Sequence, residues 1–183
     1  MKGTFTFLIL LTLLISACQE RTPGFIVLPA IIGDNMVLQQ KTDARIWGEA
    51  APGQKIVVSP EWGTSVSVKA GEDGKWLAEI PTPEAGGPYL IRIEGSDTTL
   101  TLNNILIGEV WFCSGQSNME MPLKGWPPND TIMHSATSIA AAGIPGIRLF
   151  NVQRKVSGVP LDDCTGSWQV CSPETASSFS ATA

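Results

Sequence analysis

This sequence has few histidines and no cluster of basic residues. It holds one His, and its 12 Lys and Arg residues face 17 Asp and Glu residues, for a formal net charge of −5. Nucleic-acid binding relies on clustered Lys and Arg against phosphates, so a nucleic-acid partner is excluded. The sequence has neither a Cys-x-x-Cys pair nor a Cys/His cluster. We therefore expect no metal site and no cofactor.

The apolar run at the N-terminus determines the predicted compartment. Residues 5–15 are apolar except for two Thr, and Ile-Ser-Ala-Cys follows, ending at Cys18. Such a run is typical of a signal peptide, here 1–17, and is too short to span a bilayer comfortably. The Cys after small residues resembles a bacterial lipobox. We predict an exported protein anchored by lipid on Cys18 to a bacterial membrane, in the periplasm or at the cell surface. An ordinary signal peptide with an incidental Cys, or an uncleaved anchor, are the alternatives.

Three cysteines remain beyond Cys18. Cys164 and Cys171 are close in sequence and flank Trp168, so a disulfide between them is plausible in an exported protein. Cys113 is then expected to stay free and to be buried in a strand.

The region 25–105, which follows a polar tether at 18–24, has the pattern of an antiparallel β-sandwich. Short runs alternate apolar with polar residues, and turn sequences rich in Gly and Pro separate them. The predicted strands are 36–38, 44–48, 55–58, 65–68, 75–80, 89–93 and 98–102. The predicted turns are 51–54, 72–74 and 85–88.

Three tryptophans of this region could either fill the core or form a platform for sugars. Trp47 and Trp76 lie in strand patterns, so we expect both in the core. Trp62 lies in the loop-like Pro-Glu-Trp-Gly and is the better candidate for an exposed contact.

The pattern changes after residue 105. The run 105–113 is almost continuously apolar, as in a strand that a parallel sheet buries on both faces. A helix is predicted over 131–142, capped by Asp130 and ended by a Gly and a Pro. A further strand is predicted over 146–152. Strand, loop, helix and strand together indicate the beginning of an α/β domain at 106–183.

Ser117 follows the predicted buried strand within Gly-Gln-Ser-Asn-Met. Ligands of open α/β sheets bind beyond the carboxyl ends of the strands, where this hydroxyl would be presented. Backbone N–H groups of such a turn can stabilise an oxyanion. The amides of Gln116 and Asn118 can position a polar substrate. By itself the pattern also fits an ordinary non-catalytic loop.

The block 108–121, Gly-Glu-Val-Trp-Phe-Cys-Ser-Gly-Gln-Ser-Asn-Met-Glu-Met, closely resembles the nucleophile block of the sialate O-acetylesterase family, which belongs to the SGNH hydrolases. Some acetylxylan esterases share its Gly-Gln-Ser-Asn-Met signature. Further stretches that look like the family are 34–39, 47–48, 74–76, 168–175 and 179–181. The resemblance implies a β-sandwich followed by a three-layer, flavodoxin-like α/β hydrolase domain, incomplete here. It also implies that Ser117 attacks an acetyl ester, with its own N–H as an oxyanion donor, so that acetate is released.

The catalytic base is the part of the resemblance that this sequence does not match. The family's His follows much later in an Asp-x-x-His block, which is absent, and we expect no catalytic role for His134. We therefore expect this chain to be an N-terminal fragment, inactive as it stands and poorly folded past about residue 106. The alternatives are an acetylxylan esterase, a non-catalytic lipid-anchored module that binds glycans, and a structural surface lipoprotein. The sequence does not choose between sialic acid and xylan.

Overall fold

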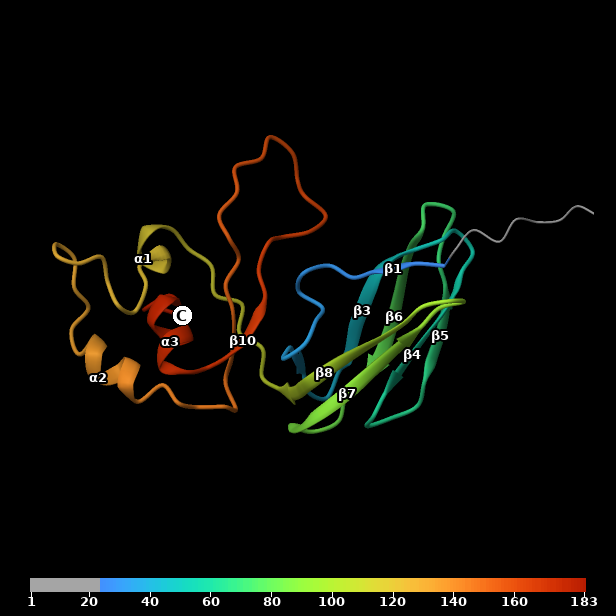
Figure 1. Ribbon diagram of the computed structural model, residues 1–183, viewed down its shortest axis with the longest axis horizontal. Helices are drawn as coiled ribbons and strands as arrows, with labels where there is room; N and C mark the ends of the chain where they lie inside the picture. The colour runs from blue at the N-terminus through green and yellow to red at the C-terminus, as the bar shows by residue number, and fades with distance from the viewer. Residues whose placement is uncertain (1–23) are drawn as a thin grey trace, which may run out of the picture.

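The computed structural model describes residues 24–183, and most of its regular structure is β-strand (Figure 1). The predicted signal peptide, Cys18 and all but the last residue of the predicted tether lie outside the described residues. No helix within 24–183 has the length and apolar character needed to cross a membrane.

Two sheets form the first part of the described chain. The three-stranded sheet has the order β1–β3–β6 and the five-stranded sheet has the order β2–β8–β7–β4–β5. The strands are β1 (Ile26–Val27), β2 (Val37–Gln39), β3 (Asp43–Ala50), β4 (Lys55–Pro60), β5 (Val66–Lys69), β6 (Lys75–Pro81), β7 (Gly86–Glu94) and β8 (Thr99–Gly108). All pairs are antiparallel except β2 with β8, which is parallel.

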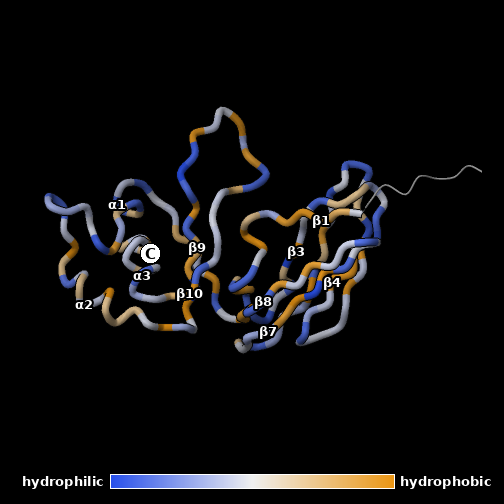
Figure 2. Tube along the Cα trace, viewed as in Figure 1, coloured by the Kyte–Doolittle hydropathy of each residue, from blue (hydrophilic) through white to orange (hydrophobic). Residues whose placement is uncertain are grey.

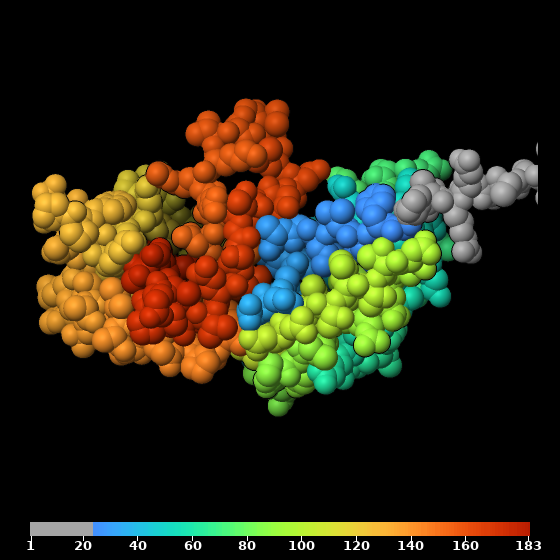
Figure 3. Space-filling view, viewed as in Figure 1, coloured from blue at the N-terminus to red at the C-terminus, as the bar shows by residue number. Residues whose placement is uncertain are grey.

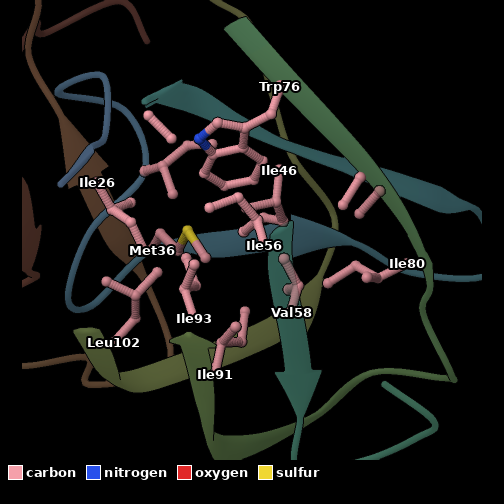
Figure 4. Close-up of a cluster of buried hydrophobic side chains, with 14 of the residues drawn as sticks. Ile26, Met36, Ile46, Ile56, Val58, Trp76, Ile80, Ile91, Ile93 and Leu102 are labelled. Atoms are coloured by element: carbon pink, nitrogen blue, oxygen red, sulfur yellow. The ribbon is translucent and has the colours of Figure 1, made fainter. Parts of the chain in front are cut away.

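The inner faces of both sheets contribute to one hydrophobic core (Figure 4). Along β3 and β6, buried and exposed positions alternate strictly, as expected for strands with one face covered. Fully buried side chains come from both sheets, among them Ile46 of β3 and Ile93 of β7. Because this core covers one face of each sheet, it produces the alternation of apolar and polar residues from which the short strands of the first part were predicted.

All seven predicted strands are present, most with ends shifted by a few residues. The strand predicted at 98–102 continues to Gly108 as β8, so it merges with the start of the strand predicted at 105–113 and crosses the domain boundary predicted at 105. The turn predicted at 85–88 is wrong, because β7 already begins at Gly86. The ladder between β7 and β8 is irregular there, with register shifts between Gly86 and Tyr89 and between Tyr89 and Ile91. An irregular ladder tolerates the Gly-Gly-Pro that suggested a turn.

The tryptophans divide differently from the prediction. Trp76 is buried, with 3% of its surface exposed, as predicted. Trp47 is 38% exposed, so its core assignment is wrong. Its neighbours Ile46 and Gly48 occupy the inward positions of β3, and alternation turns Trp47 to the outer face. Trp62 is only half-buried and packs against the core, with its indole N–H donating to the carbonyl of Pro81 at 2.9 Å, so it is not a free exposed contact.

The second part, 109–183, holds short elements joined by irregular segments. These are α1 (Ser117–Glu120), α2 (Ser135–Ala140), β9 (Arg148–Phe150), β10 (Trp168–Val170) and α3 (Pro173–Ser178). The strand predicted at 105–113 is wrong beyond residue 108, where β8 ends. Trp111 and Phe112 are 84% and 91% exposed. A strand buried on both faces needs neighbouring strands and covering layers, and no described residue pairs with 109–113.

The helix and the disulfide predicted for this part also need correction. α2 begins only at Ser135, with His134 at its N-cap position, so Asp130 caps no helix. The backbone of Asp130 is instead paired with that of Trp126 in both directions, at 2.8 and 3.2 Å. The strand predicted at 146–152 shortens to β9 and pairs antiparallel with β10. Cys164 and Cys171 are both free thiols, and the Cys171 Sγ donates to the carbonyl of Ala142 at 3.1 Å. Cys113 is free as predicted but exposed, because its strand does not form.

Several contacts join the two parts. The Trp168 indole N–H donates to the carbonyl of Ile31 at 2.7 Å, and the Arg148 guanidinium donates to the Asn104 side chain at 3.2 Å. Partial burial lowers the pKa of Arg148. The segment 151–167 between β9 and β10 projects from the body as an arm (Figures 1 and 3). Hydrophilic and hydrophobic stretches alternate along it (Figure 2).

Candidate active site

Ser117 is the first residue of α1, directly after the irregular segment that follows β8. Its N–H has no partner within the helix, because the first turn of any helix leaves its N–H groups free. The N–H groups of Met119 and Glu120 instead donate to the carbonyl of Gln116, at 2.9 and 3.2 Å. Gln116, Ser117 and Asn118 are all exposed. The turn thus presents the hydroxyl and both predicted positioning amides to solvent on consecutive residues.

Gly115 is needed for the close approach of this turn to Met119. A Cβ on Gly115 would lie 3.2 Å from the Met119 Cβ, which is tighter than an ordinary contact. A larger residue at 115 would therefore require Met119 to shift by a few tenths of an ångström. The Gly before the Gln-Ser pair therefore has a packing reason in this structure.

The last described residues hold α1 in place. The Thr182 hydroxyl donates to the carbonyl of Asn118 at 3.1 Å, and the Ser180 hydroxyl contacts the Met119 Sδ at 3.3 Å. The N–H of Ala181 donates to the carbonyl of Met121 at 2.9 Å. Residues 179–181 and the block 108–121 were singled out separately in the sequence, and the structure brings them together around Ser117.

Glu109 marks the other end of the segment that leads to Ser117. The Gln39 amide donates to one carboxylate oxygen of Glu109 at 3.0 Å, and the Gln40 amide donates to the other at 2.6 Å. The Gln39 side chain also accepts from the N–H of Val110 at 2.9 Å. These amide donors, Gln39 foremost, lower the pKa of Glu109. We call these hydrogen bonds of Gln39 and Gln40 to Glu109 the Glu109 clamp. Sequence analysis missed it, because about seventy positions separate its partners and no local pattern links them.

No described side chain is placed to activate Ser117. Among residues 24–183 the Ser117 hydroxyl has no side-chain hydrogen-bond partner, and His134 is exposed, in the left-handed conformation that precedes α2. Glu120 pairs instead with Arg154 at 2.8 Å, an exposed ion pair of small energetic weight.

Two further features of the described chain bear on the site. No group of three or more potential metal ligands occurs within it. A cavity of about 360 Å³ lies in the arm, lined by residues such as Gln153, Lys155 and Cys164. None of Gln116, Ser117 and Asn118 lines it, so this cavity is no part of the candidate site.

Comparison with known proteins finds relatives that are all named as acetylesterases. The mouse sialate O-acetylesterase is 30% identical over 167 residues, which cover 85% of this chain and 30% of the mouse protein. The human sialate O-acetylesterase is 37% identical over 101 residues, covering 49% of this chain and 19% of the human protein. The crystal structure of a carbohydrate acetylesterase from Xanthomonas citri superposes with a TM-score of 0.78 at 34% identity, over 86% of this chain and 35% of that one. No family model matches the chain.

These relatives are named as esterases that act on carbohydrates, and the similarity extends through both parts of the described chain. The chain is therefore related to the carbohydrate esterases as a class. Within that class, the chain belongs to the sialate O-acetylesterase family. It spans only about a third of the length of the relatives that match it over most of its own length.

Proposed function

We propose that the protein is a carbohydrate O-acetylesterase and that Ser117 is its nucleophile. The observation that carries the proposal is the exposed Ser117 at the start of α1, inside a Gly-Gln-Ser-Asn-Met block that belongs to a chain with esterase relatives. In this proposal the Ser117 Oγ attacks the acetyl carbonyl, the sugar hydroxyl leaves with a proton, and water then releases acetate from the acylated serine.

The neighbouring residues take defined parts in this proposal. The Ser117 N–H, which has no partner within α1, donates to the oxyanion that develops on the acetyl group. Gln116 and Asn118 hold the sugar through their amides. A serine without a base is a weak nucleophile, and no described residue supplies one, so the 183-residue chain alone is proposed to be inactive.

The domain layout and the location belong to the same proposal. In this proposal the β-sandwich, expected at 25–105, extends to the end of β8 at Gly108, and 109–183 belong to a three-layer SGNH hydrolase domain, which the similarity to esterases across both regions supports. Lipid on Cys18 attaches the exported protein to a bacterial membrane, which fits the apolar N-terminal run and the small residues before that cysteine.

The test uses the full-length protein in which this chain occurs and measures acetate release from O-acetylated sialic acid and from acetylxylan. Ser117→Ala is expected to abolish release from whichever substrate is used. Ser114→Ala is the matched control, because Ser114 is an exposed serine of the same segment and has no proposed role. Equal activity of Ser117→Ala and the unmodified enzyme would remove Ser117 as nucleophile. Turnover by the 183-residue chain, lost on Ser117→Ala, would refute the proposed inactivity.

A non-catalytic module that binds glycans is the second candidate function, favoured by the lack of a base beside Ser117 within residues 24–183. It predicts binding of a polysaccharide together with no acetate release by the full-length protein. The same two substrates, with acetate release and binding measured side by side, separate the two functions.

A further inference from the structure

Trp47 lies on the outer face of the three-stranded sheet, 38% exposed. Its direct cross-strand partner is Leu77, which is 48% exposed. The aromatic pairs of the described chain are Trp62 with Tyr89 and Phe150 with Trp168, so no other ring stacks on Trp47 within residues 24–183. A tryptophan in the centre of an outer sheet face, with no ring to pack against, needs an explanation.

Charged side chains surround this pair, and acidic groups outnumber basic ones among them. Arg45 pairs with Glu79 at 3.1 Å on one side, and Glu49 lies opposite Lys75 on the other. Lys75 is also held by Asp162 of the arm at 3.0 Å, which raises the pKa of its ammonium group. Both cations beside the pair, Arg45 and Lys75, thus have an acidic partner, and the three carboxylates of Glu49, Glu79 and Asp162 outnumber them. The face has no excess positive charge with which to attract an anionic partner.

A neutral sugar chain has the chemistry that fits this face. Each pyranose ring presents an apolar surface of C–H groups, and its hydroxyls lie around the rim. The indole of Trp47 and the side chain of Leu77 provide the apolar surface. The guanidinium of Arg45 and the carboxylates of Glu49 and Glu79 provide donors and acceptors for hydroxyls. Sites for small molecules are usually concave, whereas this site is a sheet face, which suits an extended polymer.

We propose that the outer face of β1–β3–β6, centred on Trp47 and Leu77, binds the backbone of an uncharged polysaccharide. The face concentrates the polymer on which the esterase acts, and this last statement alone rests on the proposed function. The proposal assigns the glycan to the neutral, xylan-like class rather than to sialic acid, because a sialic acid carboxylate would meet no unpaired cation at the rim.

The experiment is affinity gel electrophoresis of the full-length protein through soluble unacetylated xylan, with polysialic acid in a parallel gel. We expect xylan to retard the protein and Trp47→Ala to weaken binding about tenfold, roughly the loss of one aromatic stacking contact. Leu90→Ala is the matched control, because Leu90 is 44% exposed on β7 of the other sheet. We expect that variant to bind as the unmodified protein does.

Three results would overturn the proposal: no retardation by xylan, equal retardation of Trp47→Ala, or retardation by polysialic acid alone. A fourth is a change in size-exclusion elution on Trp47→Ala with xylan binding intact, since a second copy of the chain would then be the occupant. The polymer carries no acetyl ester, so binding is read without catalysis. Ser117→Ala should therefore bind xylan normally, and a failed esterase proposal would leave this result interpretable.

Discussion

Adjacent residues on β3 should differ sharply in their contribution to stability. Ile46 has no exposed surface and lies in the shared core, whereas Trp47 faces outward. Ile46→Ala removes roughly three carbon atoms from the core, at about 0.8 kcal/mol each, and leaves a cavity that adds to the cost. We expect a loss of about 3–4 kcal/mol. Trp47→Ala should lose less than about 1 kcal/mol, the range of an exposed cross-strand pair.

Urea denaturation followed by far-UV circular dichroism measures both free energies of unfolding. The difference between the variants matters more than either value, because both lie on the same strand and share its local backbone. A loss for Trp47→Ala equal to that for Ile46→Ala would refute the assignment of faces on β3. It would also mean that Trp47 is covered in the folded protein and is not available to a polysaccharide.

Three further predictions concern the second part of the chain and the clamp before it. Gln39→Ala should raise the pKa of Glu109 toward its ordinary value, as measured by NMR titration, and no change would refute the clamp. The lowered pKa of Glu109 means that its ionised form stabilises the fold at pH values above the ordinary carboxyl pKa. This contribution is lost as the pH falls through the lowered pKa. The stability of Gln39→Ala should therefore depend less on pH between these two pKa values. Ser172→Ala should cost about 1 kcal/mol, since the Ser172 side chain accepts from the backbone at the start of α3, and thermal unfolding would show it. A thiol reagent should label the exposed Cys113 well before the buried Cys171, by mass spectrometry of native protein, and equal rates would contradict the burial of Cys171.

The strands of the first part were predictable because their evidence is local. Each strand alternates inward apolar residues with outward polar ones, and the sheets bury one face. Trp47 shows that the type of a residue does not by itself determine which face of a strand it occupies. Its apolar character suggested the core, but Ile46 occupies the inward position, and consecutive residues of a strand cannot share a face.

The second part was less predictable because its evidence is not local. The run 105–113 has the composition of a buried strand, but burial also needs partner strands, and within 24–183 none pairs with 109–113. Asp130 is a residue type that often caps helices, but α2 begins only at Ser135, with His134 at its N-cap position. In both cases the residue types described which structure a segment could form, and the contacts made in the folded chain decided which structure it forms.

The surroundings of Ser117 also combine local features, which the sequence predicts, with non-local contacts, which it does not. The five-residue block was recognisable from the sequence alone, but its anchoring was not. One side depends on the Gln39 and Gln40 amides against Glu109, and the other on Ser180 and Thr182 against α1. These partners come from widely separated stretches, and most of the hydrogen bonds between them are exposed to solvent, so each bond contributes little free energy. Their joint effect is to restrain both ends of the segment that carries the exposed hydroxyl. The role proposed for Ser117 would need that restraint, because misplacement of a nucleophile by about 1 Å can cost a hundredfold in rate.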